Sequence, residues 1–360
     1  MTLRKPLMIV LIALLLGSCT RVGPDMVHKD RFDYTTAVGE SWKEQVLLNI
    51  VRVRYGDWPS FVTVDQIVTA YTMEHSGTAK LSMRRWWADT LTNDQLEAGW
   101  VGKFAERPTI LYTPLSGKKY VNSLLTPAQP ASILALMETG WPADHLGRIA
   151  IRSVNEHYNT SAEYDVMHRT DVVFAQFITM LKALQSAEAM KIGIKKPMDK
   201  PETIVLTLYP ARLSGELRLE LHKLKEDLGL DVTKNVYRIV RNATVEDPGE
   251  IRIQGRSVLQ VLVAMAMGVE IPDEHVRSST APPLKPIPEE EVIALPPLLV
   301  VNSGPERPKA AYVKVRYQNM WFWIDSTDHF SKRSLTYTLA LITLLDSEEK
   351  AGGSVVIPIN

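Results

Sequence analysis

The 360-residue sequence contains one cysteine, Cys19, and no long hydrophobic run. A single thiol cannot form an intramolecular disulfide, so the folded chain has to be stable without one. Two apolar stretches, Leu7–Leu16 and Val258–Val269, are both shorter than the roughly 20 residues that a transmembrane helix needs. Neither sign of charge is in excess, with 41 Lys and Arg against 41 Asp and Glu. This balance gives no electrostatic basis for binding nucleic acid or for a polybasic membrane-binding surface.

Common metal, phosphate and nucleophile motifs are also missing. The eight histidines form no H-E-x-x-H pair, and no second cysteine is present to complete a zinc site. The two glycine-rich phosphate-binding motifs, G-x-x-x-x-G-K-[ST] and G-x-G-x-x-G, do not occur. The G-x-S-x-G motif of serine hydrolases is also absent. Asp325, Thr327 and Asp328 begin like a calcium loop but lack its glycine and its closing glutamate. We therefore predict no metal, no cofactor and no catalytic residues.

The first residues have the layout of a bacterial signal peptide, residues 1–18. Arg4 and Lys5 precede the apolar run Leu7–Leu16, which ends in Leu16-Gly17-Ser18-Cys19. The final tetrad resembles the lipobox of bacterial lipoproteins, whose cysteine is acylated and becomes the first mature residue. An ordinary cleaved signal peptide with a chance cysteine is the alternative. Because the only cysteine of the chain directly follows small residues, the pattern favours lipidation of Cys19.

This resemblance also predicts where the protein is located. Lipoproteins of this kind carry two or three acyl chains, and more than one chain is needed for stable attachment. By the sorting rule of bacteria with two membranes, Thr20 after the cysteine favours the outer membrane. Residues 19–36 mix charge, Gly and Pro without periodicity, which predicts a flexible tether of roughly 20–25 Å.

Residues 37–190 are predicted to form an N-terminal α+β domain. Its first helix starts at Ser41, where Ser41 and Glu44 make a capping box, and Gly56 is the predicted stop. The other expected elements are strands within 61–71, 81–87, 109–112 and 149–154, a turn near 75–77, an exposed loop over 88–106, and helices over 117–125, 130–138 and 172–187.

A lysine- and proline-rich stretch, 191–201, is a predicted boundary before a middle α/β domain, 201–271. Its expected elements are strands at 203–208, 236–240 and 250–253, with helices at 213–228 and 258–269. Residues 272–308 have the proline-rich composition of a linker, although 298–301 can dock as a strand. Residues 309–360 are predicted to form a C-terminal ββαβ unit, and one interpretation is that it completes the middle domain. Its expected elements are a hairpin of strands 312–317 and 320–324 around Gln318-Asn319, a helix with Leu335, Leu339, Ile342 and Leu345 on one stripe, and a final strand at 355–359. The fold class is thus α+β, with short β-sheets and amphipathic helices.

Three stretches resemble a family of uncharacterised bacterial lipoproteins. They are ESWKEQVLLNIVRVRYGDWPSF at 40–61, ERPTILYTPLSGKKYVNSLLTP at 106–127 and WFWIDSTDHFSKRSLTYTLALITLL at 321–345. No activity is assigned to that family. The resemblance therefore implies attachment to the cell surface and carries over no catalytic residues.

Two small clusters raise the alternative of a cell-wall hydrolase. Ser116 and Lys119 match the S-x-x-K pattern of penicillin-recognising enzymes, but no K-T-G strand follows near the end of the chain. Asp325, Asp328 and His329 lie where a strand becomes a helix, and one interpretation of this cluster is acid–base catalysis. Helix capping by Asp328 or Ser331 is the favoured one.

Three consecutive aromatic residues, Trp321, Phe322 and Trp323, give the clearest indication of a binding surface. On one strand they place large rings on both faces, and only one face can pack on the helix at 335–345. The other face is covered by another element or by a partner. A cavity lined by Trp87, Trp100 and Trp321 would instead favour a ligand-binding protein.

The sequence thus predicts a lipoprotein tethered to the outer membrane through Cys19, in contact with the membrane only by its lipid anchor. Its expected role is that of a structural or accessory component that binds other envelope proteins. A periplasmic cell-wall hydrolase and a ligand-binding envelope lipoprotein are the alternatives.

Overall fold

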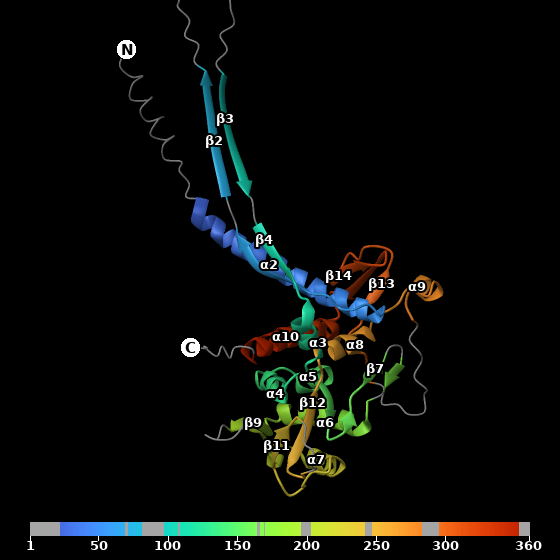
Figure 1. The fold of residues 1–360 in the computed structure, drawn as a ribbon. Coiled ribbons are helices and arrows are strands. Elements are labelled where there is room, and N and C mark those ends of the chain that lie inside the picture. Colours follow the sequence, from blue (N-terminus) through green and yellow to red (C-terminus); the bar gives the residue numbers. More distant parts are fainter. Residues whose placement is uncertain are drawn as a thin grey trace, which may run out of the picture. The chain divides into compact units, whose positions relative to one another are not determined.

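The computed structural model has an α+β fold, as the sequence predicts (Figure 1). It describes residues 22–68, 71–80, 97–106, 109–163, 166–168, 170–195, 203–241, 247–282 and 295–352. The predicted lipidation site, Cys19, and the predicted signal peptide lie outside these residues. The chain divides into a small unit, Ser60–Leu115, and a larger unit made of the segments before and after it. None of the described helices combines the length and apolarity needed to cross a membrane.

The small unit consists of two antiparallel strand pairs. Strand β1, Val62–Val68, pairs with β4, Thr109–Pro114, and β2, Tyr71–Lys80, pairs with β3, Glu97–Glu106. The turn predicted near 75–77 is instead the middle of β2, and the last part of the predicted loop at 88–106 is β3. Glycines interrupt the alternation of apolar residues in both segments, which hides the strand pattern. The strand predicted at 81–87, which includes Trp87, lies outside the described residues.

The larger unit begins with one long helix, α2, Val22–Arg54. The predicted tether is therefore helical from Val22 onward, and the helix does not start at Ser41. Side chains such as Val27 and Phe32 are exposed, whereas Val46, Leu47, Ile50 and Val51 are completely buried. An amphipathic stripe arises only where a helix packs on a core. The sequence pattern therefore marked the start of burial and missed the start of the helix.

A mixed sheet of six strands forms the centre of the larger unit, in the order β6-β5-β12-β11-β10-β9. All neighbours are antiparallel except β11 and β12, which are parallel with Arg238 opposite Glu250. The strands are β5 Ile151–Val154, β6 His157–Tyr158, β9 Met190–Lys195, β10 Thr203–Leu208, β11 Val236–Val240 and β12 Glu250–Gly255. The stretch 191–201 begins inside β9, which pairs with β10, so segments on both sides of that predicted boundary share this sheet.

Most helices predicted for this unit are confirmed. They are α3 Gly117–Leu125, α4 Pro130–Glu138, α6 Val172–Ser186, α7 Gly215–Asp227 and α8 Val258–Ala266. Helix α5, Ala143–Ala150, was not predicted. It packs closely on α6 at Gly147. A Cβ at this position would lie only 2.7 Å from the Ile178 side chain, so the two helices approach each other closely there. Smaller elements are β7 Ser161–Glu163, β8 Val166–His168, η1 Pro210–Arg212 and α9 Asp273–Arg277.

Arg256 is a buried cation that holds the end of α5. Its guanidinium donates to the carbonyl oxygens of Arg148 at 2.8 Å, Ile149 at 3.3 Å and Thr160. The first two belong to the last turn of α5, whose carbonyls lack helical partners and carry the negative end of the helix dipole. Burial lowers the pKa of Arg256 to about 9, so the side chain is still charged at neutral pH.

The C-terminal part forms a sheet of three antiparallel strands, in the order β13-β15-β14, followed by a long helix. The elements are β13 Asn302–Gly304, β14 Ala311–Tyr317, β15 Met320–Asp325 and α10 His329–Gly352. The predicted hairpin is confirmed, with Gln318 and Asn319 both at positive φ in its turn. The buried stripe of α10 includes Ser334, Leu335, Thr338 and Leu341, so it is rotated from the predicted stripe, which began at Leu335 and Leu339. The final strand predicted at 355–359 lies outside the described residues.

Part of the predicted linker, 272–308, is packed. Leu299 and Val301 are completely buried, and Val301 pairs with Val269. The carbonyl oxygen of Leu299 lies 1.7 Å from where a Cβ at Gly268 would be placed, so only glycine permits this close approach.

Candidate functional site

Strand β15 is the central strand of the C-terminal sheet, and its two faces differ sharply. Phe322 and Ile324 are completely buried on one face. Trp321 and Trp323 are partly exposed on the other face. Successive side chains of a strand point to opposite faces, so the three consecutive aromatic residues are divided between the core and the surface. The expectation of large rings on both faces is confirmed.

The inner face of the sheet is part of the core of the larger unit. Val315 lies opposite Phe322 and Val313 opposite Ile324, and both valines are buried. The Phe322 ring meets the ring of Tyr55, just after α2, edge to face with centroids 6.0 Å apart. The end of α2, which the sequence did not indicate, is therefore among the elements that cover this face.

The outer face combines the two tryptophans with basic side chains. Lys314 lies opposite Trp323 and Arg316 opposite Trp321, and directly opposite residues of an antiparallel pair share one face. The guanidinium of Arg307 lies over the Trp321 ring, 5.6 Å from its centroid, which is a cation–π contact. We call Arg307, Lys314, Arg316, Trp321 and Trp323 the basic aromatic face.

Both tryptophans are paired with residues of β13. Asn302 and Gly304 of β13 are opposite Trp323 and Trp321, respectively. A Cβ at Gly304 would be 3.5 Å from the Trp323 ring, an ordinary van der Waals distance, so the indole lies beside this glycine. The face thus has two partly exposed rings with cations beside them.

No ion pair within the described part of the chain involves the three cations of the basic aromatic face. Two carboxylates near this sheet accept hydrogen bonds from neutral groups. Asp325 accepts from the hydroxyl and the backbone N–H of Thr327, and these bonds lower its pKa. Glu270 accepts from the backbone N–H of Ser303 at 3.1 Å. The face thus has three cations without an ion-pair partner among the described residues, while Asp325 lies two residues beyond Trp323 on the same strand and Glu306 precedes Arg307 in the sequence.

The cluster of Asp325, Asp328 and His329 serves to begin helix α10. The Asp328 carboxylate accepts from the backbone N–H of Ser331 at 3.0 Å and also from the Ser331 hydroxyl. The Asp328 carbonyl accepts from the N–H of Lys332. Capping by Asp328, the favoured interpretation, is confirmed. Within the described residues, no group of His, Cys, Asp and Glu has the geometry of a metal site.

Ser116 and Lys119 do not form a catalytic pair in this structure. Both are exposed at the start of α3, and the Ser116 side chain makes no capping hydrogen bond. A nucleophilic serine needs a base within hydrogen-bond reach, and no such bond joins these two described residues.

A histidine–serine pair that the sequence did not reveal lies between α5 and α10. His145 Nε2 is 2.6 Å from Ser334 Oγ, and the Ser334 hydroxyl donates to the carbonyl of Leu298. His145 therefore donates to Ser334, and its ring stacks on Phe330 with centroids 4.2 Å apart. Burial, and then the charge of Arg148, lowers the pKa of His145 to about 4. Ser334 is completely buried, and its hydroxyl proton is already donated to the Leu298 carbonyl. The pair is therefore structural.

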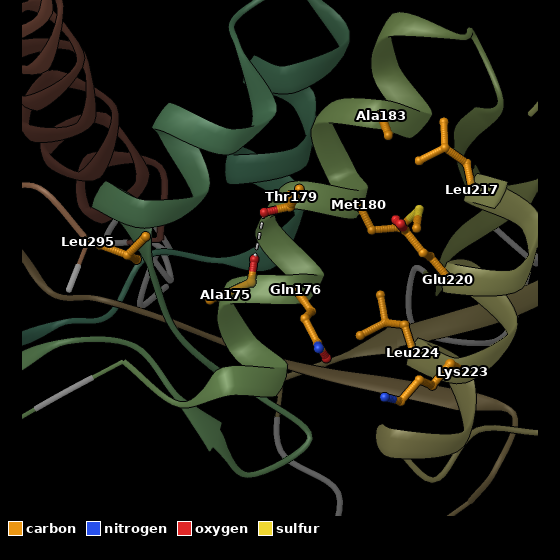
Figure 2. A pocket seen from close by; sticks show the side chains of 10 residues that line it. All are labelled: Ala175, Gln176, Thr179, Met180, Ala183, Leu217, Glu220, Lys223, Leu224 and Leu295. Carbon is orange, nitrogen blue, oxygen red and sulfur yellow. Dashed lines mark hydrogen bonds between the residues drawn. The ribbon is translucent and has the colours of Figure 1, made fainter. Parts of the chain in front are cut away.

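An open, mainly apolar groove of about 480 Å³ lies between α6 and α7 (Figure 2). Ala175, Thr179 and Met180 line one side, while Leu217, Glu220 and Leu224 line the other. Of the tryptophans weighed for a ligand cavity, Trp321 is not among its lining residues. Trp87 lies outside the described residues, and so does the side chain of Trp100.

No family model, no curated protein and no solved structure matches this chain. The family resemblance of the three quoted stretches therefore stays a prediction. The basic aromatic face could have been found in part from the sequence, because Val313 and Val315 alternate with Lys314 and Arg316 beside the aromatic strand. The contribution of Arg307 comes from a loop and has no such signal.

Proposed function

We propose that the protein is a lipoprotein anchored in the outer membrane through Cys19 and acts as an accessory component that binds other envelope proteins. The lipobox-like tetrad at 16–19 supports the anchor. The observation that carries the binding role is the pair Trp321 and Trp323, partly exposed side by side on a sheet face. Trp and Arg are enriched among the residues that dominate binding energy at protein interfaces.

Helix α2 supports a role in which the body acts at a distance from the anchor. From Val22 to Trp42 it is about 20 residues long, which at 1.5 Å per residue is roughly 30 Å. Most side chains from Val27 to Ser41 are exposed, whereas most from Val46 to Arg54 are buried. A helical spacer is stiffer than the coil that the composition predicts. It therefore restricts the range of positions that the binding face can take relative to the anchor.

In-cell crosslinking followed by mass spectrometry of the captured proteins tests this function. The double variant Trp321→Ala/Trp323→Ala removes the two rings from the face. Trp58→Ala is the matched control, because Trp58 is 52% exposed and lies outside the face. The expected result is a set of envelope proteins captured by the parent chain and by Trp58→Ala, and lost from the double variant. An unchanged set in the double variant would contradict the proposed role of this face.

A ligand-binding role is the second candidate, and the groove between α6 and α7 supports it. Its volume is in the range of small-molecule sites, and its lining is mostly apolar with a few polar groups. Ala183→Trp, at a partly exposed position of the lining, would fill the groove, with Val172→Trp, at an exposed position near the start of α6, as the control. Loss of a co-purifying small molecule from Ala183→Trp alone would support this candidate, and an identical small-molecule content in both variants would count against it.

A further inference from the structure

We propose that the basic aromatic face binds an acidic protein segment in extended conformation, with carboxylates at alternate positions. This inference rests on the proposed function, because it names the chemistry of the partner at the same face. It depends on the charge of the face, the partial burial of its two rings and the spacing of its cations.

The charge of the face calls for an anionic partner. Arg307, Lys314 and Arg316 have no carboxylate partner among the described residues, although the whole chain carries equal numbers of acidic and basic residues. Complementary charge steers association and selects among partners. An acidic segment would supply carboxylates with which these three cations can form ion pairs.

The partial burial of the two rings favours a protein over a lipid bilayer. Trp323 lies beside Gly304, and the Arg307 guanidinium lies over the Trp321 ring. Both side chains are partly buried, whereas insertion into a membrane interface needs apolar side chains that enter the layer by roughly 5–10 Å. Partly buried rings with cations beside them suit a segment that lies across the sheet.

The spacing of the cations suggests the pattern of acidic residues. Lys314 and Arg316 are two residues apart on β14, so they share a face and their Cα atoms are roughly 7 Å apart. In an extended partner, alternate side chains share a face at the same spacing. Asp or Glu at positions i and i+2 would therefore reach both cations at once, while the side chains between them point away.

Calorimetric titration of the full-length chain, in non-ionic detergent, tests the inference. The probe is a synthetic peptide in which Glu alternates with Ser, compared with its Lys–Ser counterpart and with a peptide that has the same number of Glu at every third position. We expect binding of the alternating Glu peptide alone, with affinity that falls as salt is added. Equal affinity for the Lys–Ser peptide would overturn the charge argument, and equal affinity for the third-position peptide would overturn the spacing.

Charge reversal locates the binding on the molecule. Lys314→Glu/Arg316→Glu should weaken binding of the alternating peptide by about tenfold or more. Lys118→Glu/Lys119→Glu is the matched control, because it makes the same change in net charge at two exposed positions on α3. Equal weakening by both variants would overturn the assignment. Thermal unfolding of each variant confirms that it is folded.

Two outcomes separate this inference from the proposed function. If sedimentation shows the chain binding anionic vesicles through Lys314 and Arg316 without binding the peptide, the occupant is a lipid surface and the inference fails. If charge reversal leaves the captured envelope proteins unchanged while Trp321→Ala/Trp323→Ala removes them, the inference fails and the proposed function stands.

Discussion

Trp321 and Phe322 are adjacent in the sequence and lie on opposite faces of the same strand. Phe322 is completely buried against Val315 and Tyr55, and Trp321 is partly exposed beneath Arg307. One residue of β15 thus stabilises the fold while its neighbour is available for binding. This division allows the two roles to be tested separately by mutation.

Alanine substitutions at these two positions should have very different effects on stability. Phe322→Ala should lower the free energy of unfolding by roughly 3–5 kcal/mol, because it leaves a cavity in the core. Trp321→Ala should cost about 1 kcal/mol or less, since the ring is not part of the core. Chemical denaturation of the two variants measures both values. A loss of stability in Trp321→Ala as large as that in Phe322→Ala would place the tryptophan in the core.

His145 should make the protein less stable as the pH falls below about 6.5. Its pKa is lowered to about 4 in the folded state by burial, so the unfolded chain binds the extra proton more readily. The neighbours Asp144, Arg148, Lys182 and Arg333 act on the same ring. The stability contributed by the neutral ring is complete above pH 6.5 and is lost progressively toward pH 4. The loss should be on the order of 3 kcal/mol.

Thermal unfolding of the parent and of His145→Gln from pH 7 to pH 4 measures this effect. The variant should show a shallower decline than the parent. His222→Gln is the control, because His222 is an exposed residue of α7. A decline that is the same in the parent and in His145→Gln would show that other groups control the acid sensitivity.

Arg256 should be essential to the packing of α5. Its guanidinium donates to carbonyls at the end of that helix and at Thr160, so Arg256→Met removes this donor from the carbonyls of Ile149 and Thr160, while the Arg148 carbonyl keeps the Asn159 amide. Each such acceptor costs about 1–3 kcal/mol, and the variant should lose several kcal/mol or fail to fold. Arg152→Met, at an exposed neighbouring position, should be mild. Comparable unfolding midpoints for the two variants would be inconsistent with this role.

Lipidation should depend on Cys19 alone. Cys19→Ser removes the only thiol, so we expect an unprocessed or released chain with no acyl adduct. Intact-mass measurement of the purified protein and fractionation of the cells provide the readouts. A membrane fraction that does not change in Cys19→Ser would argue that another feature attaches the protein.

The sequence predicts this fold best for elements in which apolar residues recur at regular spacing and pack on the core. Strands 203–208 and 236–240 and helices 117–125 and 130–138 have the predicted bounds, because burial imposes their periodicity. Helix α2 begins 19 residues before the predicted start at Ser41, since an exposed helix needs no apolar stripe. Contacts between distant residues leave no local signal, and His145 and Ser334 are 189 residues apart.

The candidate site was predictable to the same extent. The three aromatic residues at 321–323 identify the strand, and the alternation at 313–316 indicates that basic residues lie beside it. The sequence does not show which ring is buried, because that depends on the contact of Phe322 with Tyr55 across the fold. It also does not show that the Trp323 ring lies beside Gly304 of β13.

Site-specific photo-crosslinking in living cells tests the central claim most directly. A photoreactive residue replaces Arg316 on the basic aromatic face in one full-length chain and Lys119 on α3 in another. We expect a crosslink to an acidic segment of an envelope protein from position 316 and none to that protein from position 119. If position 316 yields no crosslinked protein, or if both positions capture the same one, the basic aromatic face is not the binding surface.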